Sequence, residues 1–279
     1  MKFISAIIRK MVHTEKYNKL SDTLKNMGSV AVAFSGGVDS SLMIYVAHQL
    51  LKNKAKAYTI KTPYIAKWEL DEAKEFCSNF KIPLQILELP IDKALLNNPE
   101  NRCYVCKTIL FKKLKEITRQ DGYNFVVDGT NHDDQNDFRP GLKALEELEI
   151  RSPFKEAEIT KNEIRDISRY YGLPTWDKPA YACLLTRIPH NSAVIPDDLR
   201  RIELAEKFLI DSGFRAVRVR SHKNLARIEV NQEDIPKLAN ISLSKKITNK
   251  LKQLGFIYVT LDMEGYRTGS LNPQQKMHS

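Results

Sequence analysis

Cysteine is scarce in this chain, yet two of its four cysteines, Cys103 and Cys106, lie three positions apart in the stretch NRCYVCK. A bend or a helical turn at this spacing places both thiols on one side. Such a pair can bind zinc, bind an iron–sulfur cluster, form a redox disulfide or fill space in a core. The spacing alone leaves these alternatives open.

The stretch FSGGVDSS, residues 34–41, has the composition of a phosphate-binding loop. Gly36 and Gly37 allow backbone amides to approach a ligand closely, and the amides at the start of a helix attract anions. The loop contains no lysine and no GxGxxG pattern, which excludes a Walker A loop and a dinucleotide fingerprint. A tight strand-to-helix turn without a ligand is the alternative. Hydroxyl groups come from Ser35, Ser40 and Ser41.

Asp39 within this loop bears on which ligands the loop could bind. A carboxylate in the first turn of a helix is favoured by the helix dipole, but it repels a bound phosphate. Mg²⁺ binds carboxylate and phosphate oxygens together, so a phosphate in this loop predicts Mg²⁺ at Asp39. The alternative is that Asp39 only caps the turn.

A second polar stretch, DGTNHDDQNDFRPG at 128–141, begins where an apolar run ends. Ligands of open α/β sheets bind at the carboxyl ends of strands, so this position favours a binding loop. Its candidate ligand-binding residues are Asp128, Asn131, Asp133, Asp134, Asp137 and Arg139. Solvated turn residues are the alternative, because Asp and Asn favour turns for local reasons.

Two further stretches carry candidate residues. In TWDKPAYACLLTR, the cations Lys178 and Arg187 flank Cys183, and such neighbours favour a nucleophilic or metal-binding thiolate over an ordinary loop cysteine. In AVRVRS, Arg218 and Arg220 share one face of a strand, which suits a phosphate or a carboxylate. A solvated basic face is the alternative.

In the first half of the sequence, short apolar runs alternate with helical patterns, and these elements must position the residues named above. This alternation predicts a doubly wound, mainly parallel α/β sheet. A Thr160/Glu163 capping box begins its last helix, and Cys77 shares a helical face with other apolar residues, which predicts a core position. The expected strands are 29–34, 56–62, 83–90 and 124–130, and the expected helices are 38–52, 66–80, 103–122 and 160–172.

A stretch with four prolines, 173–196, breaks this rhythm and predicts an ordered loop. We therefore expect a first domain at 1–190 and a small α+β domain at 191–279. The second domain is expected to contain helices at 197–213 and 244–255, and strands at 216–221, 225–230 and 256–263.

The composition is that of a soluble globular protein, with 42% hydrophobic and 28% charged residues among 279. The net charge of +10 favours anionic partners such as nucleotides or nucleic acid. No apolar run is long enough to span a membrane. Arg9 and Lys10 interrupt the N-terminal apolar patch, so we expect a packed helix or arm, no secretory signal, and a cytoplasmic protein.

The sequence SGGVDS resembles the signature of the PP-loop ATP pyrophosphatases, which cleave ATP between the α- and β-phosphates. The resemblance implies ATP and Mg²⁺, with pyrophosphate bound by the loop and Asp39 near the metal. The residues concerned are Ser35, Gly36, Gly37, Val38, Asp39, Ser40 and Ser41.

Within that superfamily the chain resembles the ATP-dependent sacrificial sulfur transferases of the LarE family. NRCYVCK, DGTN…RPG, LPTWDKPA-ACL-TR and the late Arg-x-Arg strand occur in the family's order. The resemblance implies a pyridinium dicarboxylate mononucleotide as substrate, adenylylated on a carboxylate and then sulfurated for the nickel-pincer cofactor. It implies that sulfur is delivered at Cys183. The residues it places around the substrate are Asp134, Arg139, Arg218, Arg220 and Glu229.

Members of that family differ in how sulfur is supplied. A lone cysteine can give up its own sulfur, or a C-x-x-C can join it to hold a [4Fe-4S] cluster carrying an exchangeable sulfide. Cys103, Cys106 and Cys183 match the second pattern, which needs sulfide or another sulfur donor. Three thiolates leave one iron open. Zinc with His132 or His190 as fourth ligand is an alternative, and a redox disulfide lacks a thioredoxin-like context.

Three other functions compete with this interpretation. A tRNA 2-thiolation enzyme combines the same ATP chemistry with a three-cysteine cluster, and the positive charge favours tRNA as a partner. However, the chain lacks zinc-ribbon cysteines and a dense basic tract with aromatic residues. An ammonia-using ligase and a non-catalytic ATP-binding regulator are the other two. The resemblance also implies a homo-oligomer, with the small domain packing against other subunits.

Overall fold

The computed structural model describes residues 15–136 and 140–267. These residues form two compact units. The first contains 15–62, 69–89 and, with the gap at 137–139, 101–181; the second contains 63–68, 90–100 and 182–267. The predicted domain limits, 1–190 and 191–279, stay a prediction, because compactness alone does not test independent folding.

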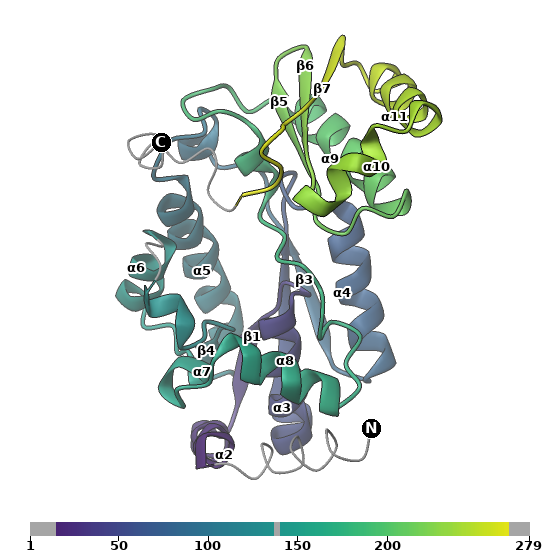
Figure 1. Cartoon of the computed structure of the whole chain (residues 1–279). Helices are drawn as coiled ribbons and strands as arrows, with labels where there is room; N and C mark the ends of the chain where they lie inside the picture. The colour runs from purple at the N-terminus through teal and green to yellow at the C-terminus, as the bar shows by residue number, and fades with distance from the viewer. Residues whose placement is uncertain (1–14, 137–139, 268–279) are drawn as a thin grey trace, which may run out of the picture. The chain divides into compact units, whose positions relative to one another are not determined.

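The first unit is built on a four-stranded sheet in the order β3-β2-β1-β4, in which every neighbouring pair is parallel (Figure 1). Short apolar sequences form its central strands, as expected for strands covered on both faces. The predicted parallel α/β architecture is confirmed. The strands are β1 (Val30–Ala33), β2 (Ala55–Lys61), β3 (Leu84–Glu88) and β4 (Phe125–Val127).

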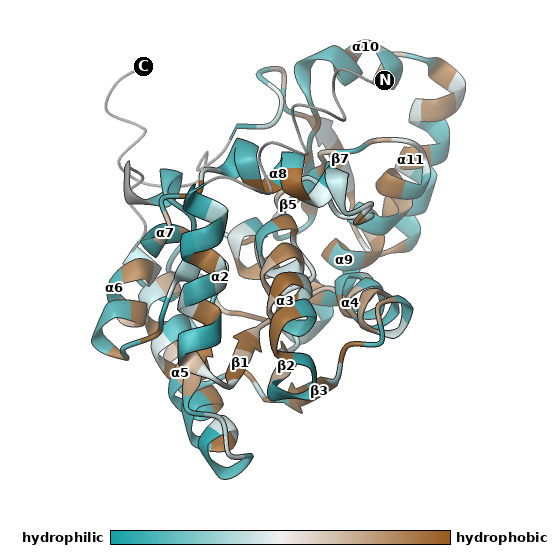
Figure 2. Ribbon diagram, turned by 90° about the horizontal axis from the view of Figure 1, so that it is seen from below, coloured by the Kyte–Doolittle hydropathy of each residue, from teal (hydrophilic) through white to brown (hydrophobic). Residues whose placement is uncertain are grey.

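Helices cover both faces of this sheet. Val30 and Val32 pack with α3 and α4 in one core cluster, whereas Ala31 packs with α5 and α6 in the other. Figure 2 shows that α3 and the central strands are largely apolar. The helices of this unit are α2 (Glu15–Met27), α3 (Val38–Leu51), α4 (Lys67–Asn79), α5 (Arg102–Gln120), α6 (Pro140–Glu147), α7 (Pro153–Glu156) and α8 (Lys161–Tyr170), with short 3-10 turns η1 (Lys52–Lys54) and η3 (Asp133–Asn136).

The strand order reverses between β1 and β4. The chain moves from β1 to β2 and β3 on one side, and β4 returns to the other side of β1. Ligands of doubly wound sheets bind at such a switch point, beyond the carboxyl ends of the strands. Both polar stretches singled out in the sequence follow these two strands, at 34–41 and 128–141.

The second unit contains a three-stranded sheet in the order β5-β6-β7. Strands β5 (Arg218–His222) and β6 (Leu225–Glu229) are antiparallel, and β7 (Tyr258–Leu261) is parallel to β6. The predicted small α+β fold is confirmed. Its helices are α9 (Pro196–Asp211), α10 (Ile235–Leu238) and α11 (Ile241–Gln253), with 3-10 turns η2 (Lys93–Leu95), η4 (Leu184–Arg187) and η5 (Gln232–Asp234).

Cys77 lies in the core, as predicted. Its side chain is 2% exposed in α4, and burial raises the pKa of its thiol to about 12. The thiol is therefore held protonated and unreactive. No helix among residues 15–136 and 140–267 is long and apolar enough to cross a membrane. Residues 1–14 of the predicted N-terminal arm are not among the described residues.

We expect the Thr160→Ala substitution to lower the free energy of unfolding by about 1 kcal/mol, the usual cost of losing an N-cap. The Thr160 hydroxyl accepts from the Glu163 amide, and the Glu163 carboxylate accepts from the Thr160 amide, at the start of α8. Chemical denaturation measures the change. The control is Thr108→Ala, because the Thr108 hydroxyl donates to the Tyr104 carbonyl within α5 and does not cap a helix end. Equal losses in both variants would contradict the prediction.

Candidate active site

The loop between β1 and α3 is closed on itself by short polar contacts. Gly36 has φ +71°, a conformation that favours glycine, and a Cβ there would lie 3.2 Å from the Ala73 Cβ. The Ser40 hydroxyl accepts from the Ser35 amide at 3.2 Å and lies 3.0 Å from the Ser35 hydroxyl. The Ser41 hydroxyl is buried and has no hydrogen-bond partner within the described part of the chain. A bound anion would satisfy such a donor.

Lys178 contacts this loop from outside it. The Lys178 ammonium donates to the Gly36 carbonyl at 2.8 Å and pairs with Glu72 at 2.7 Å. It therefore fixes the backbone of the loop at the residue with positive φ. The sequence placed Lys178 near Cys183 as a cation, and its contacts instead serve the phosphate-binding loop.

Asp39 lies at the switch point between the two strands. Its carboxylate pairs with the Lys161 ammonium and accepts from the Asn131 side chain at 3.2 Å. A Cβ on Gly129 would lie 2.9 Å from the Asp39 Cβ and from the Ser40 amide. Glycine is therefore required for the loop after β4 to approach α3 this closely. Sequence reasoning missed both Lys161 and the close approach of the two loops at Gly129.

Asp134, a predicted substrate-binding residue, shapes the loop after β4. Its carboxylate accepts from the Asn131 amide at 3.0 Å, and the residue is 9% exposed. Asp128 accepts from the Thr130 amide at 3.2 Å and the Ser152 hydroxyl at 2.7 Å. These bonds hold Asn131 against Asp39. Arg139 lies outside the described residues.

Cys103 and Cys106 lie in the first turns of α5, in the first unit. Cys103 is exposed and Cys106 is partly exposed. Their place in the first turns leaves these thiols at one end of α5. Helix α6 packs closely on this turn, because a Cβ on Gly141 would lie 2.7 Å from the Lys107 side chain and 3.5 Å from the Cys103 carbonyl.

Cys183 belongs to the second unit, where it precedes η4. Its carbonyl accepts from the Thr186 amide at 3.0 Å and the Thr186 hydroxyl at 2.8 Å. Arg187, 1% exposed, donates to the Ala182 carbonyl at 3.0 Å and forms a bidentate ion pair with Glu206 at 2.7 and 3.0 Å. A buried ion pair thus anchors the turn that carries Cys183.

Asn98 fixes the far end of the same turn. It is fully buried, and its side-chain amide donates to the carbonyls of Leu185, Ile188 and Pro189 at 3.0 to 3.2 Å. The Leu184 amide donates to the Tyr64 carbonyl at 2.9 Å. Sequence reasoning missed Asn98 and Glu206, because neither stretch carries a motif that signals these distant partners.

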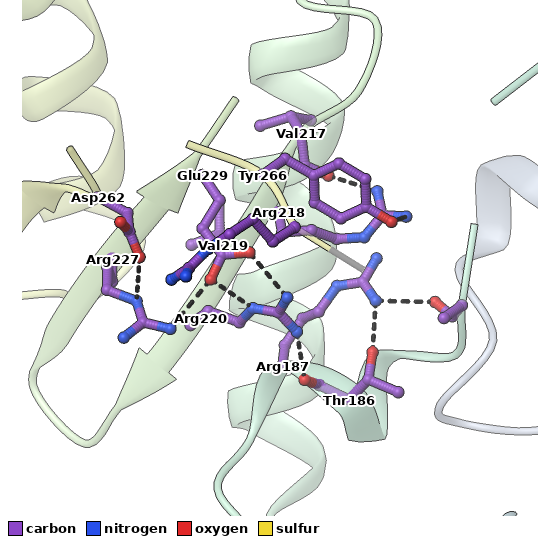
Figure 3. A network of polar contacts seen from close by, with 12 residues as sticks. Thr186, Arg187, Val217, Arg218, Val219, Arg220, Arg227, Glu229, Asp262 and Tyr266 are labelled. Atoms are coloured by element: carbon purple, nitrogen blue, oxygen red, sulfur yellow. Dashed lines mark hydrogen bonds and ion pairs between the residues drawn. The ribbon is translucent and has the colours of Figure 1, made fainter. Parts of the chain in front are cut away.

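Arg220 and Glu229 form a second buried ion pair, with contacts of 2.9 and 2.7 Å (Figure 3). Arg220 also donates to the Thr186 carbonyl at 2.6 Å, which links this pair to the Cys183 turn. Arg227 contacts both Glu229, at 2.9 Å, and Asp262, at 3.5 Å. Glu229 is therefore shared between two guanidinium groups.

Arg218 lies in a different environment from Arg220. Its guanidinium donates to the Val217 carbonyl at 2.7 Å and lies 4.7 Å from the centre of the Tyr266 ring (Figure 3). Burial lowers the pKa of Arg218, and the nearby charge of Arg187 lowers it further. The charged guanidinium of Arg218 is therefore buried at a cost in desolvation free energy.

His222, at the end of β5, is also partly buried near positive charge. Burial lowers its pKa, as do the neighbouring charges of Arg227 and Arg220, while Glu229 opposes the shift. The net effect favours the neutral imidazole.

The predicted metal ligands are divided between the two units. Cys103, Cys106 and His132 belong to the first, and Cys183 and His190 to the second. Among residues 15–136 and 140–267 no group of three or more His, Cys, Asp or Glu is arranged to hold a metal ion. Iron–sulfur and zinc binding both stay predictions.

Comparison with known proteins gives three informative relatives. A PP-loop domain model matches residues 9–137. An uncharacterized protein of Synechocystis sp. is 39% identical over 259 residues, which covers 92% of this chain and 97% of the relative. Pyridinium-3,5-bisthiocarboxylic acid mononucleotide synthase of Lactiplantibacillus plantarum is 33% identical over 252 residues, which covers 89% and 91%. A tRNA-specific 2-thiouridylase of Clostridium botulinum is 25% identical over 191 residues, which covers 54% and 52%.

The similarity to the Lactiplantibacillus synthase extends through both units, whereas the similarity to the 2-thiouridylase covers about half of each chain. The matched PP-loop domain contains the loop at 34–41, the Cys-x-x-C stretch and the strands of the parallel sheet. The chain is an ATP-using sulfur transferase that belongs to the LarE family of PP-loop proteins.

Proposed function

We propose that the enzyme adenylylates a carboxylate of a pyridinium dicarboxylate mononucleotide and replaces the activated oxygen by sulfur, giving a thiocarboxylate for the nickel-pincer cofactor. The observation that carries this proposal is the similarity, over 89% of the chain, to a synthase whose product is a bisthiocarboxylic acid mononucleotide. A thiocarboxylic product requires an activated carboxylate, and a PP-loop supplies ATP for that activation.

In the first step a substrate carboxylate oxygen attacks the α-phosphorus of ATP. The bond to the β-phosphate oxygen breaks, and pyrophosphate leaves. We assign the pyrophosphate to residues 35–41, because they include the start of α3, where helix amides attract anions, and because the buried Ser41 hydroxyl lacks a partner in the described chain. Val38, the first residue of α3, contributes its amide.

Asp39 is the proposed Mg²⁺ ligand. Its carboxylate and the hydroxyl groups of the loop are hard oxygen donors, which Mg²⁺ prefers. When bound, Mg²⁺ supplies charge neutralisation on the phosphate oxygens. Asn131 and Gly129 then act through Asp39, because they fix the position of its carboxylate.

In the second step sulfur attacks the activated carboxyl carbon, the carbon–oxygen bond to AMP breaks, and AMP leaves. Cys103, Cys106 and Cys183 are the proposed ligands of a [4Fe-4S] cluster, which when bound supplies an exchangeable sulfide at its open iron. The exposed thiol at the start of α5 and the anchored turn at Cys183 support this assignment. Sulfide or another donor replenishes the sulfur. Cys183 as a sacrificial donor is the alternative.

We place the mononucleotide against Arg218, Arg220 and Glu229, with Asp134 and Arg139 as further contacts. Burial and then the nearby charge of Arg187 lower the pKa of Arg218, and an anionic group bound there would offset both effects. The Arg220 contact to Thr186 connects this region to the Cys183 turn. Arg220 and Glu229 then orient the substrate while neutralising each other.

The enzyme is also proposed to form a homo-oligomer through its second unit. Several large apolar side chains are exposed there, which suits an interface. They are Ile241, 71% exposed, Tyr258, 64% exposed, and Met263, 79% exposed.

A tRNA 2-thiolation activity is the second candidate, favoured by the partial similarity to a 2-thiouridylase and by the net charge of +10. The two functions are distinguished by supplying ATP, Mg²⁺ and a sulfide donor together with either the mononucleotide or unmodified tRNA. We expect pyrophosphate and AMP in equal amounts, with a thiocarboxylate product, only with the mononucleotide. Pyrophosphate formed only with tRNA would replace the proposal by its rival.

We expect anaerobically prepared protein to contain about four irons with acid-labile sulfide per chain. Cys106→Ala and Cys183→Ala should lose the iron, because each removes one of three thiolate ligands. Cys77→Ala is the matched control and should retain it, since Cys77 lies in the core. Zinc at about one per chain, or no metal after reconstitution with iron and sulfide, would contradict the cluster.

We expect Arg218→Met to weaken mononucleotide binding by about tenfold or more through loss of a charge-assisted contact. Its free energy of unfolding should fall by about 1 kcal/mol, because the substitution removes the hydrogen bond to the Val217 carbonyl. Calorimetric titration and denaturation measure the two effects. Arg220→Met should lower stability more, since it breaks the buried ion pair with Glu229. Unchanged substrate binding by Arg218→Met would remove this residue from the site.

A further inference from the structure

The peptide group between Gly36 and Gly37 lies within the phosphate-binding loop, directly before α3. Gly36 is buried and has φ +71°, and Gly37 is the N-cap of α3 with φ −81°. A trans peptide group is planar, so its C=O and its N–H point in opposite directions. A contact that fixes the Gly36 carbonyl therefore also fixes the direction of the Gly37 amide.

Lys178 holds the carbonyl side of this peptide group. Its ammonium donates to the Gly36 carbonyl at 2.8 Å, and Glu72 balances its charge at 2.7 Å. The Lys178 side chain is 13% exposed, so the contact is largely shielded from water. On the other side, the Gly37 amide lies 3.4 Å from the Ser35 hydroxyl, which is a long hydrogen bond. The stronger contact is on the carbonyl side, and the amide stays available to an anion.

The backbone around Lys178 is itself fixed by α8. Arg165 donates to the carbonyls of Trp176 and Lys178 at 2.7 and 3.2 Å. The guanidinium of Arg169, one turn further along α8, lies 4.0 Å from the centre of the Trp176 ring. The Lys178 amide donates to the Thr175 carbonyl at 3.0 Å. A fixed segment of the first unit therefore brings this ammonium to the loop.

Glycine on both sides of the peptide group makes a second orientation accessible. A rotation of the peptide plane by half a turn changes ψ of Gly36 and φ of Gly37, and glycine accepts both signs of φ. The rotated group would direct its carbonyl oxygen, instead of its N–H, toward a bound anion. One orientation therefore binds pyrophosphate, and the apparent affinity depends on the fraction of the protein that adopts it.

We infer that Lys178 is a positioning residue, whose contact with the Gly36 carbonyl prevents rotation of this peptide group and keeps the Gly37 amide directed at the pyrophosphate. Lys178 acts through the backbone and does not touch the ligand. An ion pair with Glu72 that only stabilises the fold is the alternative. The inference rests on the proposed binding of pyrophosphate at residues 35–41, and it is independent of the sulfur acceptor.

The first test is calorimetric titration of the full chain with Mg²⁺-pyrophosphate. Lys178→Met should weaken binding by roughly tenfold or more, because a hydrogen bond from a charged donor no longer favours the binding orientation. Lys74→Met is the matched control, since its ammonium pairs with Asp71 within α4, the helix that also carries Glu72. It should bind like the original protein. Melting temperatures confirm that each variant is folded, and unchanged binding by Lys178→Met would overturn the inference.

Gly37→Ala separates the orientation of the peptide group from the charge of the lysine. Alanine accepts the present φ of −81°, and a Cβ there would lie 3.4 Å from the Ser35 hydroxyl oxygen, an ordinary contact. Rotation of the peptide group would give residue 37 a positive φ, which alanine disfavours. Lys178→Met should therefore weaken pyrophosphate binding by a smaller factor in the Gly37→Ala background. The same factor in both backgrounds would assign the effect to charge and overturn the inference.

NMR spectroscopy observes the orientation directly. The chain has 11 glycines, so ¹⁵N-glycine labelling gives few amide signals, and the Gly37 signal is the one that Gly37→Ala lacks. Without ligand, we expect this signal to split or broaden by exchange in Lys178→Met and to stay sharp in Lys74→Met. An unchanged Gly37 signal in Lys178→Met would overturn the inference and leave ATP use intact. A native protein that binds neither pyrophosphate nor ATP would instead overturn the proposed function.

Discussion

The close approach of the loop after β4 to the first turn of α3 determines the rest of the first unit's polar site. Parallel pairing of Val30 with Phe125 and of Val32 with Val127 brings the ends of β1 and β4 level. At Gly129 there is no room for a Cβ against Asp39. A larger residue would separate the two loops, and Asn131 would then lose its contact with the Asp39 carboxylate.

The second unit carries a different constraint, which is buried charge. Arg187 pairs with Glu206, and Arg220 with Glu229, at exposures of 5% or less. Buried ion pairs recover their desolvation cost poorly, so they add little net stability compared with apolar residues. Their geometric effect is clearer: the first pair holds the carbonyls around Cys183, and the second reaches the same turn through Thr186. The two ion pairs therefore fix the backbone of this turn and add little to the free energy of unfolding.

Local signals in the sequence predicted the sheet, the capped helix, the phosphate-binding loop and the core position of Cys77, because each depends on neighbouring residues. Lys161 and Asn98 were missed because their partners lie far along the chain and neither belongs to a motif. The assignment of 63–68 and 90–100 to the second unit was missed for the same reason. Arg218 and Arg220 were predicted to share one face, but their separate partners depend on Tyr266 and Glu229, which no strand pattern identifies.

A phosphate-binding loop that contains a carboxylate needs a cation in both of its states. Without a ligand, an unpaired Asp39 would lie partly buried at the start of a helix, where one ammonium suffices to balance it. Bound phosphates would add negative charge beside Asp39, and a divalent cation is the group that binds carboxylate and phosphate oxygens together. The cation of the empty loop is Lys161, which reaches Asp39 from a capped helix far along the chain. The charge balance of this loop is therefore set by the packing of α8 beside it and not by the residues of the loop itself.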